Sequence, residues 1–187
     1  MLGTLVRAET NLLVEPILAW RAWTLTGRRD GTRLRLRPLS GGPWPWPPME
    51  PAHGTCRRRR LHPVPGIDCT CGLHAVRDPD PLRRARNPGV IGTAALWGRV
   101  VEHEHGYRGE FAYPQRLRLV CHLCLWRKGN HPNRCDVVVR LRGGRLVPLC
   151  AEHLELSRRH GYPTPRLIPA AQVEAELLST YGVDLAC

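Results

Sequence analysis

The chain has 187 residues, enough for one ordinary domain or two small ones, and its 18 Gly and 18 Pro favour short strands and irregular connections over long helices. Its formal net charge is +12, almost entirely from arginine, because Lys128 is the only lysine. A basic surface favours phosphate backbones or an acidic protein as partner. No apolar run approaches the roughly 18 residues of a membrane-spanning helix, so we expect no membrane contact.

The amino terminus and the cysteines together indicate the compartment. The first 16 residues lack the long apolar core and the cleavage site of a secretory signal, so we expect a cytoplasmic protein. In that compartment the 8 Cys are better interpreted as metal ligands than as disulfides. We expect bound ions, more than a large apolar core, to stabilise such a loop-rich chain.

The first elements are a short helix over residues 2–13 and a hairpin over residues 17–39, with its turn at Gly27 to Gly31. In the second strand of the hairpin, leucines alternate with Arg33, Arg35 and Arg37. This alternation predicts a buried leucine face and an arginine face. The arginines either follow a phosphate backbone or simply solvate the sheet.

Residues 40–54 contain too many prolines for regular structure, and we expect an extended, polyproline-like segment. Trp44 and Trp46 lie within it. We expect both indoles to pack against the sheet. The alternative is an exposed ledge for a base or a peptide.

Four potential metal ligands follow within 16 residues: Cys56, His62, Cys69 and Cys71. The prolines and glycine between them supply the bends that such a short loop needs, and metal binding would supply the stability that it lacks. We predict a zinc site here, in which His53 or His74 could replace His62. The alternative is a pair of ordinary thiols beside a basic loop.

Residues 77–92 are predicted to be a loop with a basic centre, and residues 93–120 to be two strands joined by a turn near Gly106 to Gly109. His103 and His105 would share one strand face and could hold an open catalytic zinc, with Glu102 or Glu110 as base. A solvated surface is the more common role of such residues. No phosphate loop, dinucleotide fingerprint or H-E-x-x-H motif is present, so the sequence argues against an enzyme without excluding one.

Residues 121–160 have the clearest pattern of the chain. Cys121 and Cys124 are two residues apart, and Cys150 and His153 repeat that gap after a 25-residue spacer. Two such pairs suit a closed structural zinc site. Between them we expect a hairpin that turns at Gly143 and Gly144, and at the second pair a helix that begins.

This succession of knuckle, hairpin and ligand-bearing helix start resembles the treble-clef and zinc-ribbon fingers. The resemblance covers residues 121–160 only and implies Cys121, Cys124, Cys150 and His153 as zinc ligands. Three further residues could enter or replace that set: His122, His131 and Cys135. A last helix is predicted after residue 168, with an apolar stripe formed by Val173, Leu177 and Tyr181.

We therefore expect an α+β protein with a mainly-β module over residues 1–120, which includes the zinc loop of residues 56–71, and a treble-clef-like finger with C-terminal helices over residues 121–187. Two Zn²⁺ ions are expected. The leading functional hypothesis is a zinc-stabilised basic module that contacts DNA or RNA, within a larger complex. The arginines expected at that contact are Arg33, Arg35, Arg37, Arg57, Arg58, Arg59, Arg60, Arg83, Arg84 and Arg86. The alternatives are a protein-interaction scaffold anchored by Trp44, Trp46 and the last helix, and, with less weight, a metal-dependent hydrolase.

Overall fold

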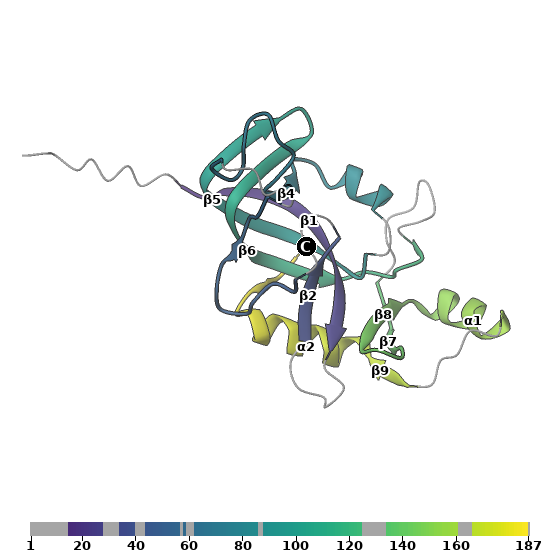
Figure 1. Ribbon diagram of the computed structural model, residues 1–187. Coiled ribbons are helices and arrows are strands. Elements are labelled where there is room, and N and C mark those ends of the chain that lie inside the picture. The colour runs from purple at the N-terminus through teal and green to yellow at the C-terminus, as the bar shows by residue number, and fades with distance from the viewer. Residues whose placement is uncertain are drawn as a thin grey trace, which may run out of the picture.

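The computed structural model describes residues 15–27, 34–39, 44–56, 58, 62–85, 88–124, 134–160 and 166–186. The described strands are β1 (Ile17–Gly27), β2 (Leu34–Pro38), β3 (Ala52–His53), β4 (Leu73–Val76), β5 (Val90–His103), β6 (Gly106–Leu119), β7 (Val137–Arg140), β8 (Arg145–Leu149), β9 (Leu167–Pro169) and β10 (Asp184–Leu185). The described helices are the 3-10 helix η1 (Asp80–Arg84) and the α-helices α1 (Ala151–Arg159) and α2 (Ala170–Tyr181). Over these described residues the protein is mostly β-sheet, with two α-helices, and most of its strands are short, as the composition led us to expect (Figure 1).

Strand β1 is the centre of the sheet. It pairs antiparallel with β2, β4, β5 and β8, so it joins the first half of the chain to the second. The long β5–β6 hairpin lies beside it, with register irregularities at Thr93/Ala94 and between Trp97 and Val100. Both predicted strand pairs of the first 120 residues are present, but the second turns at Glu104 and His105, and the predicted turn residues, Gly106 to Gly109, are paired in β6. The predicted helix of residues 2–13 lies outside the described residues.

The main core is larger than the sequence led us to expect. Trp23, Leu25, Leu36, Leu96, Leu117 and Leu177 are all buried in one cluster. The alternation predicted for β2 is confirmed, since Leu34 and Leu36 are buried while Arg35 is half-buried and Arg37 exposed. This part of the sheet therefore has an apolar core of its own, apart from any bound ion.

The same core continues past residue 120. Val138 and Leu146 of the β7–β8 hairpin belong to it, and so does the apolar stripe of α2, whose Val173, Leu177 and Tyr181 are buried as predicted. The Tyr181 hydroxyl accepts a hydrogen bond from the Leu36 amide and donates one to the Trp46 carbonyl. Helix α2 thereby closes the end of the core near β2, while β7, β8 and α1 extend to one side (Figure 1).

The two tryptophans of the proline-rich segment have different environments. Trp46 is buried, with its ring edge-on to Trp23 at 5.4 Å between centroids, and its amide donates to the Leu36 carbonyl. Trp44 is 79% exposed, so the expectation that it packs against the sheet is wrong. A polyproline-like segment has three residues per turn, and side chains two positions apart therefore point in different directions.

Candidate metal centres

Three cysteines and one histidine meet where the β7–β8 hairpin leads into α1. Cys121 and Cys124 follow β6, Cys150 is the N-cap residue of α1, and His153 lies in the first turn of that helix. We call these four residues the finger group. Their potential ligand atoms all lie within 4.8 Å of one another.

The spacing of these atoms fits one tetrahedral ion. With zinc–sulfur bonds of about 2.3 Å and a zinc–nitrogen bond of about 2.0–2.1 Å, a tetrahedron separates two sulfurs by about 3.8 Å and a sulfur from an imidazole nitrogen by about 3.6 Å. The Sγ atoms of Cys124 and Cys150 are 3.8 Å apart. The His153 Nδ1 lies 3.5 Å from Cys121 Sγ, 3.4 Å from Cys124 Sγ and 3.1 Å from Cys150 Sγ. The finger group is therefore able to hold a metal ion.

Burial defines the chemistry of the finger group. All four residues are buried, and Cys121 is fully inaccessible. That burial raises the pKa of the Cys121 thiol to about 12, since a thiolate without a cation is costly inside protein. A bound cation would remove that cost, and a fully enclosed site leaves no position for a substrate. The finger group is therefore suited to a structural ion.

The second group lies on the irregular segment before β4. Cys56, His62, Cys69 and Cys71 bring their potential ligand atoms within 4.8 Å of one another, and we call them the loop group. Cys56 Sγ lies 3.8 Å from Cys69 Sγ, and Cys71 Sγ lies 4.0 Å from His62 Nε2. His62 Nδ1 is 2.7 Å from the Pro63 carbonyl, to which it can donate, so that Nε2 is the nitrogen left to face the sulfurs. The geometry of this predicted set also fits an ion.

The loop group is far less enclosed than the finger group. Cys56 and His62 are only half-buried, and the three cysteines line an open hollow of about 260 Å³ together with Arg58 and His74. A hydrogen bond from the Cys71 amide, helped by neighbouring side chains, lowers the pKa of Cys69 to about 6. A sulfur that is already anionic near neutral pH is prepared to bind a cation.

Arg108 of β6 supports this loop from the sheet, a role that was not predicted from the sequence. Its buried guanidinium donates from Nη1 to the carbonyls of Gly66, Cys69 and Cys71, at 3.0 Å for Gly66 and 3.3 Å for Cys71. These bonds fix the backbone that carries two of the four ligands. The interaction arises because Arg108 of β6 is opposite His74 of β4 in the register, which no local sequence pattern reveals.

The other ligands that the sequence allowed do not join either group. His74 Nε2 is 2.8 Å from the Thr70 carbonyl, His53 packs edge-on against Phe111, and His122 Nδ1 is 2.9 Å from the Pro88 carbonyl. Cys135 is half-buried and packs against the main core. His131 lies outside the described residues.

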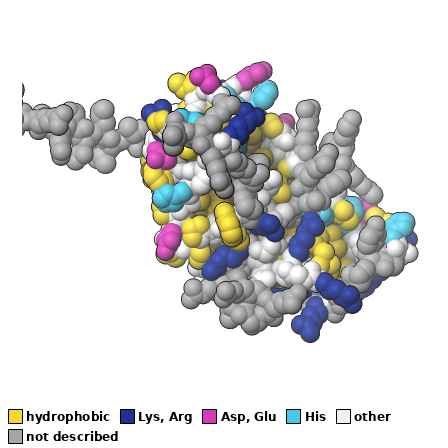
Figure 2. Space-filling view, viewed as in Figure 1, with side chains coloured by type: hydrophobic (Ala, Val, Ile, Leu, Met, Phe, Trp, Pro, Cys, Tyr) yellow, Lys and Arg dark blue, Asp and Glu magenta, His cyan; other side chains and the backbone are white. Residues whose placement is uncertain are grey.

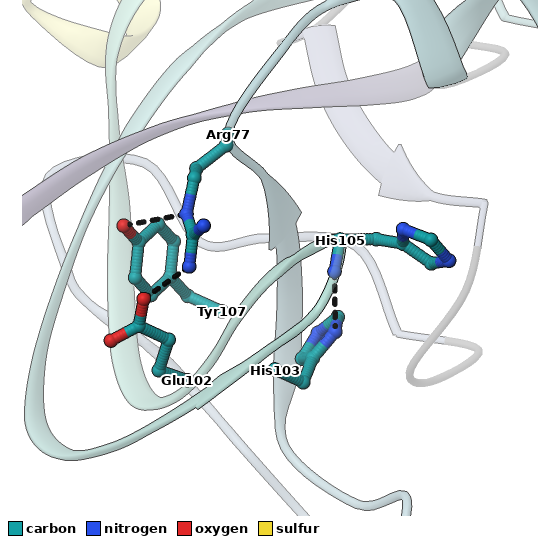
Figure 3. Close-up of polar contacts among 5 residues, drawn as sticks. All are labelled: Arg77, Glu102, His103, His105 and Tyr107. Atoms are coloured by element: carbon teal, nitrogen blue, oxygen red, sulfur yellow. Dashed lines mark hydrogen bonds and ion pairs between the residues drawn. The ribbon is translucent and has the colours of Figure 1, made fainter.

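His103 and His105 do not share a strand face. His103 ends β5 and His105 lies in the turn, where the His105 amide donates to His103 Nδ1 at 3.4 Å and the His105 ring points away (Figure 3). Neither residue belongs to the metal-competent groups found among the described residues. The nearby charges are used locally, because Arg77 donates to the Tyr107 hydroxyl and pairs with Glu102 (Figure 3). The expected face shared by the two histidines is therefore wrong.

The arginines expected at a nucleic-acid contact are described only in part. Arg35 and Arg37 lie on the outer face of β2, and Arg58 is exposed beside the loop group. The structure adds Arg145, because Thr26 of β1 lies between Arg35 on β2 and Arg145 on β8. The remaining side chains lie outside the described set: Arg33, Arg57, Arg59, Arg60, Arg83, Arg84 and Arg86.

Charge is unevenly distributed over the surface. Figure 2 shows arginine side chains in both halves of the visible face, several of them along the lower half from the region of β2 toward α1, while the visible acidic side chains lie mainly at the upper and left rim. None of the ion pairs found within the described ranges involves Arg35, Arg37 or Arg145. These three guanidinium groups are not neutralised there by a carboxylate.

No family model matches the chain, and searches of curated proteins and of solved structures find no match either. Among the described helices, none has the length and apolarity needed to cross a membrane. The seven described cysteines form no disulfide. In the part of the chain that the structure describes, the protein is mainly β-sheet, with two Cys₃His groups that are each able to hold a metal ion.

Proposed function

We propose that this protein is a zinc-stabilised basic module that binds nucleic acid through the outer face of β2, β1 and β8. The observation that carries the proposal is the row formed by Arg35, Arg37 and Arg145, which the register of three neighbouring strands brings to one face. A single arginine on a surface is weak evidence for nucleic-acid binding. A row of guanidinium groups without carboxylate partners can contact successive phosphates of one backbone.

The metal in this proposal is zinc, and its role is to position that face. Three thiolates and one imidazole are a donor set that zinc prefers. The finger group joins the end of β6 to the end of β8, on which Arg145 lies. We propose that residues 121–160 form a treble-clef-like finger that holds this hairpin against β1, and that the protein acts in the cytoplasm, within a larger complex.

Binding to duplex and single-stranded oligonucleotides at several salt concentrations tests the proposal. The logarithm of affinity should fall with the logarithm of salt with a slope of several units, because phosphate contacts release counterions. Arg35→Gln, Arg37→Gln and Arg145→Gln should each weaken binding and reduce the slope by about 1. Arg77→Gln is the matched control, since Arg77 already pairs with Glu102 and its loss should leave the slope unchanged.

A flat salt dependence of the unaltered protein would exclude nucleic-acid binding. A salt slope that survives all three substitutions would place the contact elsewhere on the chain. Thermal melting of each variant checks that the sheet is intact.

The alternative function is a protein-interaction scaffold, and most of the residues predicted to contact its partner are buried. Trp46 and the apolar stripe of α2 are buried in the protein's own core, so they are not available to a partner. Trp44 alone keeps its large exposed surface. A stable partner protein that co-purifies through nuclease treatment and high salt would revive this alternative.

A further inference from the structure

Trp44 is a large apolar side chain that is exposed on the surface and does not belong to the main core. Pro45 and Pro47 restrict the backbone that follows it, and Trp46 anchors that backbone in the core through its edge-on contact with Trp23 and its hydrogen bonds. The Arg21 guanidinium lies over the Trp46 ring at 4.9 Å from its centroid, which fixes the anchor further. The exposed indole is therefore presented on a supported segment.

A hollow of about 350 Å³ lies beside this indole. Its volume is within the range of about 300–1,000 Å³ that is typical of small-ligand pockets. The apolar part of the lining comes from two tryptophans, four prolines, Ala52 and Leu73, and the polar groups are His53, Thr55 and the carboxylate of Glu50. An aromatic wall with a few donors and acceptors suits a flat heterocycle better than an aliphatic ligand.

A second hollow, whose lining includes one guanidinium, adjoins the aromatic one. Thr55 lines both the Trp44 hollow and the hollow of about 260 Å³ over the loop group, whose lining includes Arg58. A ligand that places a ring on Trp44 therefore has a guanidinium in the neighbouring hollow. A nucleotide chain alternates aromatic rings with phosphates, so it matches an aromatic hollow that lies next to a guanidinium.

We propose that the Trp44 hollow binds an unpaired base of a single-stranded nucleic acid, with the adjoining phosphate toward Arg58. The inference rests on the proposed nucleic-acid function and narrows it to single strands at this site. A base inside a duplex is already stacked on its neighbours and cannot enter a side hollow, whereas every unpaired base offers a free face to an indole. The net charge of +12 favours a polyanion over a proline-rich peptide, which would otherwise suit the aromatic wall.

The test compares a 15-nucleotide oligothymidylate and an oligouridylate with a duplex of equal length, on the full chain loaded with zinc. Trp44→Ala should weaken binding of the single strands about ten-fold, in line with the loss of one stacked base, and should leave duplex binding and the salt slope unchanged. Trp44→Phe should recover most of the affinity, because it keeps an aromatic face. Leu18→Ala removes another exposed apolar side chain, outside both hollows, and should have no effect.

The outcomes separate this inference from the function on which it rests. If the unaltered protein shows no salt-dependent binding, the proposed function fails. If it binds but Trp44→Ala leaves single-strand affinity unchanged, or lowers single-strand and duplex affinity equally, only the base site is refuted. The base site would also be refuted if a proline-rich peptide displaced the oligonucleotide at a peptide concentration below that of the oligonucleotide. The hollow would then bind a protein ligand more tightly than a base.

Discussion

The finger group and the loop group each consist of three cysteines and one histidine, but they differ in how far the protein encloses them. The finger group is enclosed by a strand end, a hairpin and the first turn of α1, and all its members are buried. The loop group lies on irregular backbone, and two of its four ligands are only half-buried. Similar distances between ligand atoms therefore arise from two different supports.

The difference shows what each ion would stabilise. In the finger group the ligands lie at the ends of regular elements, after β6, after β8 and in the first turn of α1, so an ion there would tie β8 and α1 to the end of β6. In the loop group the backbone is held partly by Arg108, whose guanidinium replaces the hydrogen-bond donors that a strand or helix would supply. We expect the first ion to stabilise the fold and the second to order one surface.

The largest expected effect follows from Cys121→Ser. A buried group with one ligand missing loses its ion, and three thiol or imidazole groups then remain buried without a cation. We expect one zinc less per chain and a fall in melting temperature of more than about 10 °C. Calorimetry and elemental analysis measure both quantities.

Cys135→Ser is the matched control for Cys121→Ser, because Cys135 is also partly buried but lies outside both groups. It should keep two zinc ions and melt within a few degrees of the unaltered protein. A Cys121→Ser variant with unchanged zinc content and melting temperature would contradict the structural role of the finger group.

Cys69→Ser should have a smaller effect. The loop ion is lost, but the main core and the finger do not depend on it, so we expect a fall of about 4–8 °C in melting temperature and an unchanged far-ultraviolet spectrum. Amide hydrogen exchange should increase in residues 54–72 and remain unchanged in α1. Equal destabilisation by Cys69→Ser and Cys121→Ser would refute the difference between the two groups.

The sequence was sufficient to predict the two sets of potential ligands that the structure brings together, and insufficient to predict what supports them. Cys121 and Cys124, like Cys150 and His153, are close because a turn or helix start fixes residues three positions apart, so local spacing predicts them. Arg108 and Arg145 reach their positions through strand pairing between segments far apart in the chain, and that register is not encoded in any short pattern. The size of the core was underestimated for the same reason. Strand β1 pairs with four other strands, and together they bury side chains from segments far apart in the sequence.

Arg108→Met tests the support of the loop group without removing a ligand. The methionine keeps much of the apolar stem but leaves the carbonyls of Gly66, Cys69 and Cys71 without their donor, so we expect a loss of about 1–3 kcal/mol in the free energy of unfolding. Zinc affinity of the loop group should fall about 10–100-fold, as it does for other groups that orient ligands, and the finger group should be unaffected. Arg116→Met, on an exposed position of the same strand, is the control.

The smallest effect needs no substitution and concerns the order of metal release. A chelator must reach the ion, and the hollow beside Cys56, Cys69 and Cys71 admits it, whereas the finger group has no accessible ligand. Under a limiting chelator, native mass spectrometry should show a long-lived species with one zinc, and its melting temperature should fall no further than that of Cys69→Ser. Alkylation of that species should label cysteines of the loop group before Cys121 or Cys124, because a thiolate reacts only where the reagent can approach it. Simultaneous loss of both ions, or early labelling of the finger group, would mean that the two groups are coupled and that enclosure does not decide their stability.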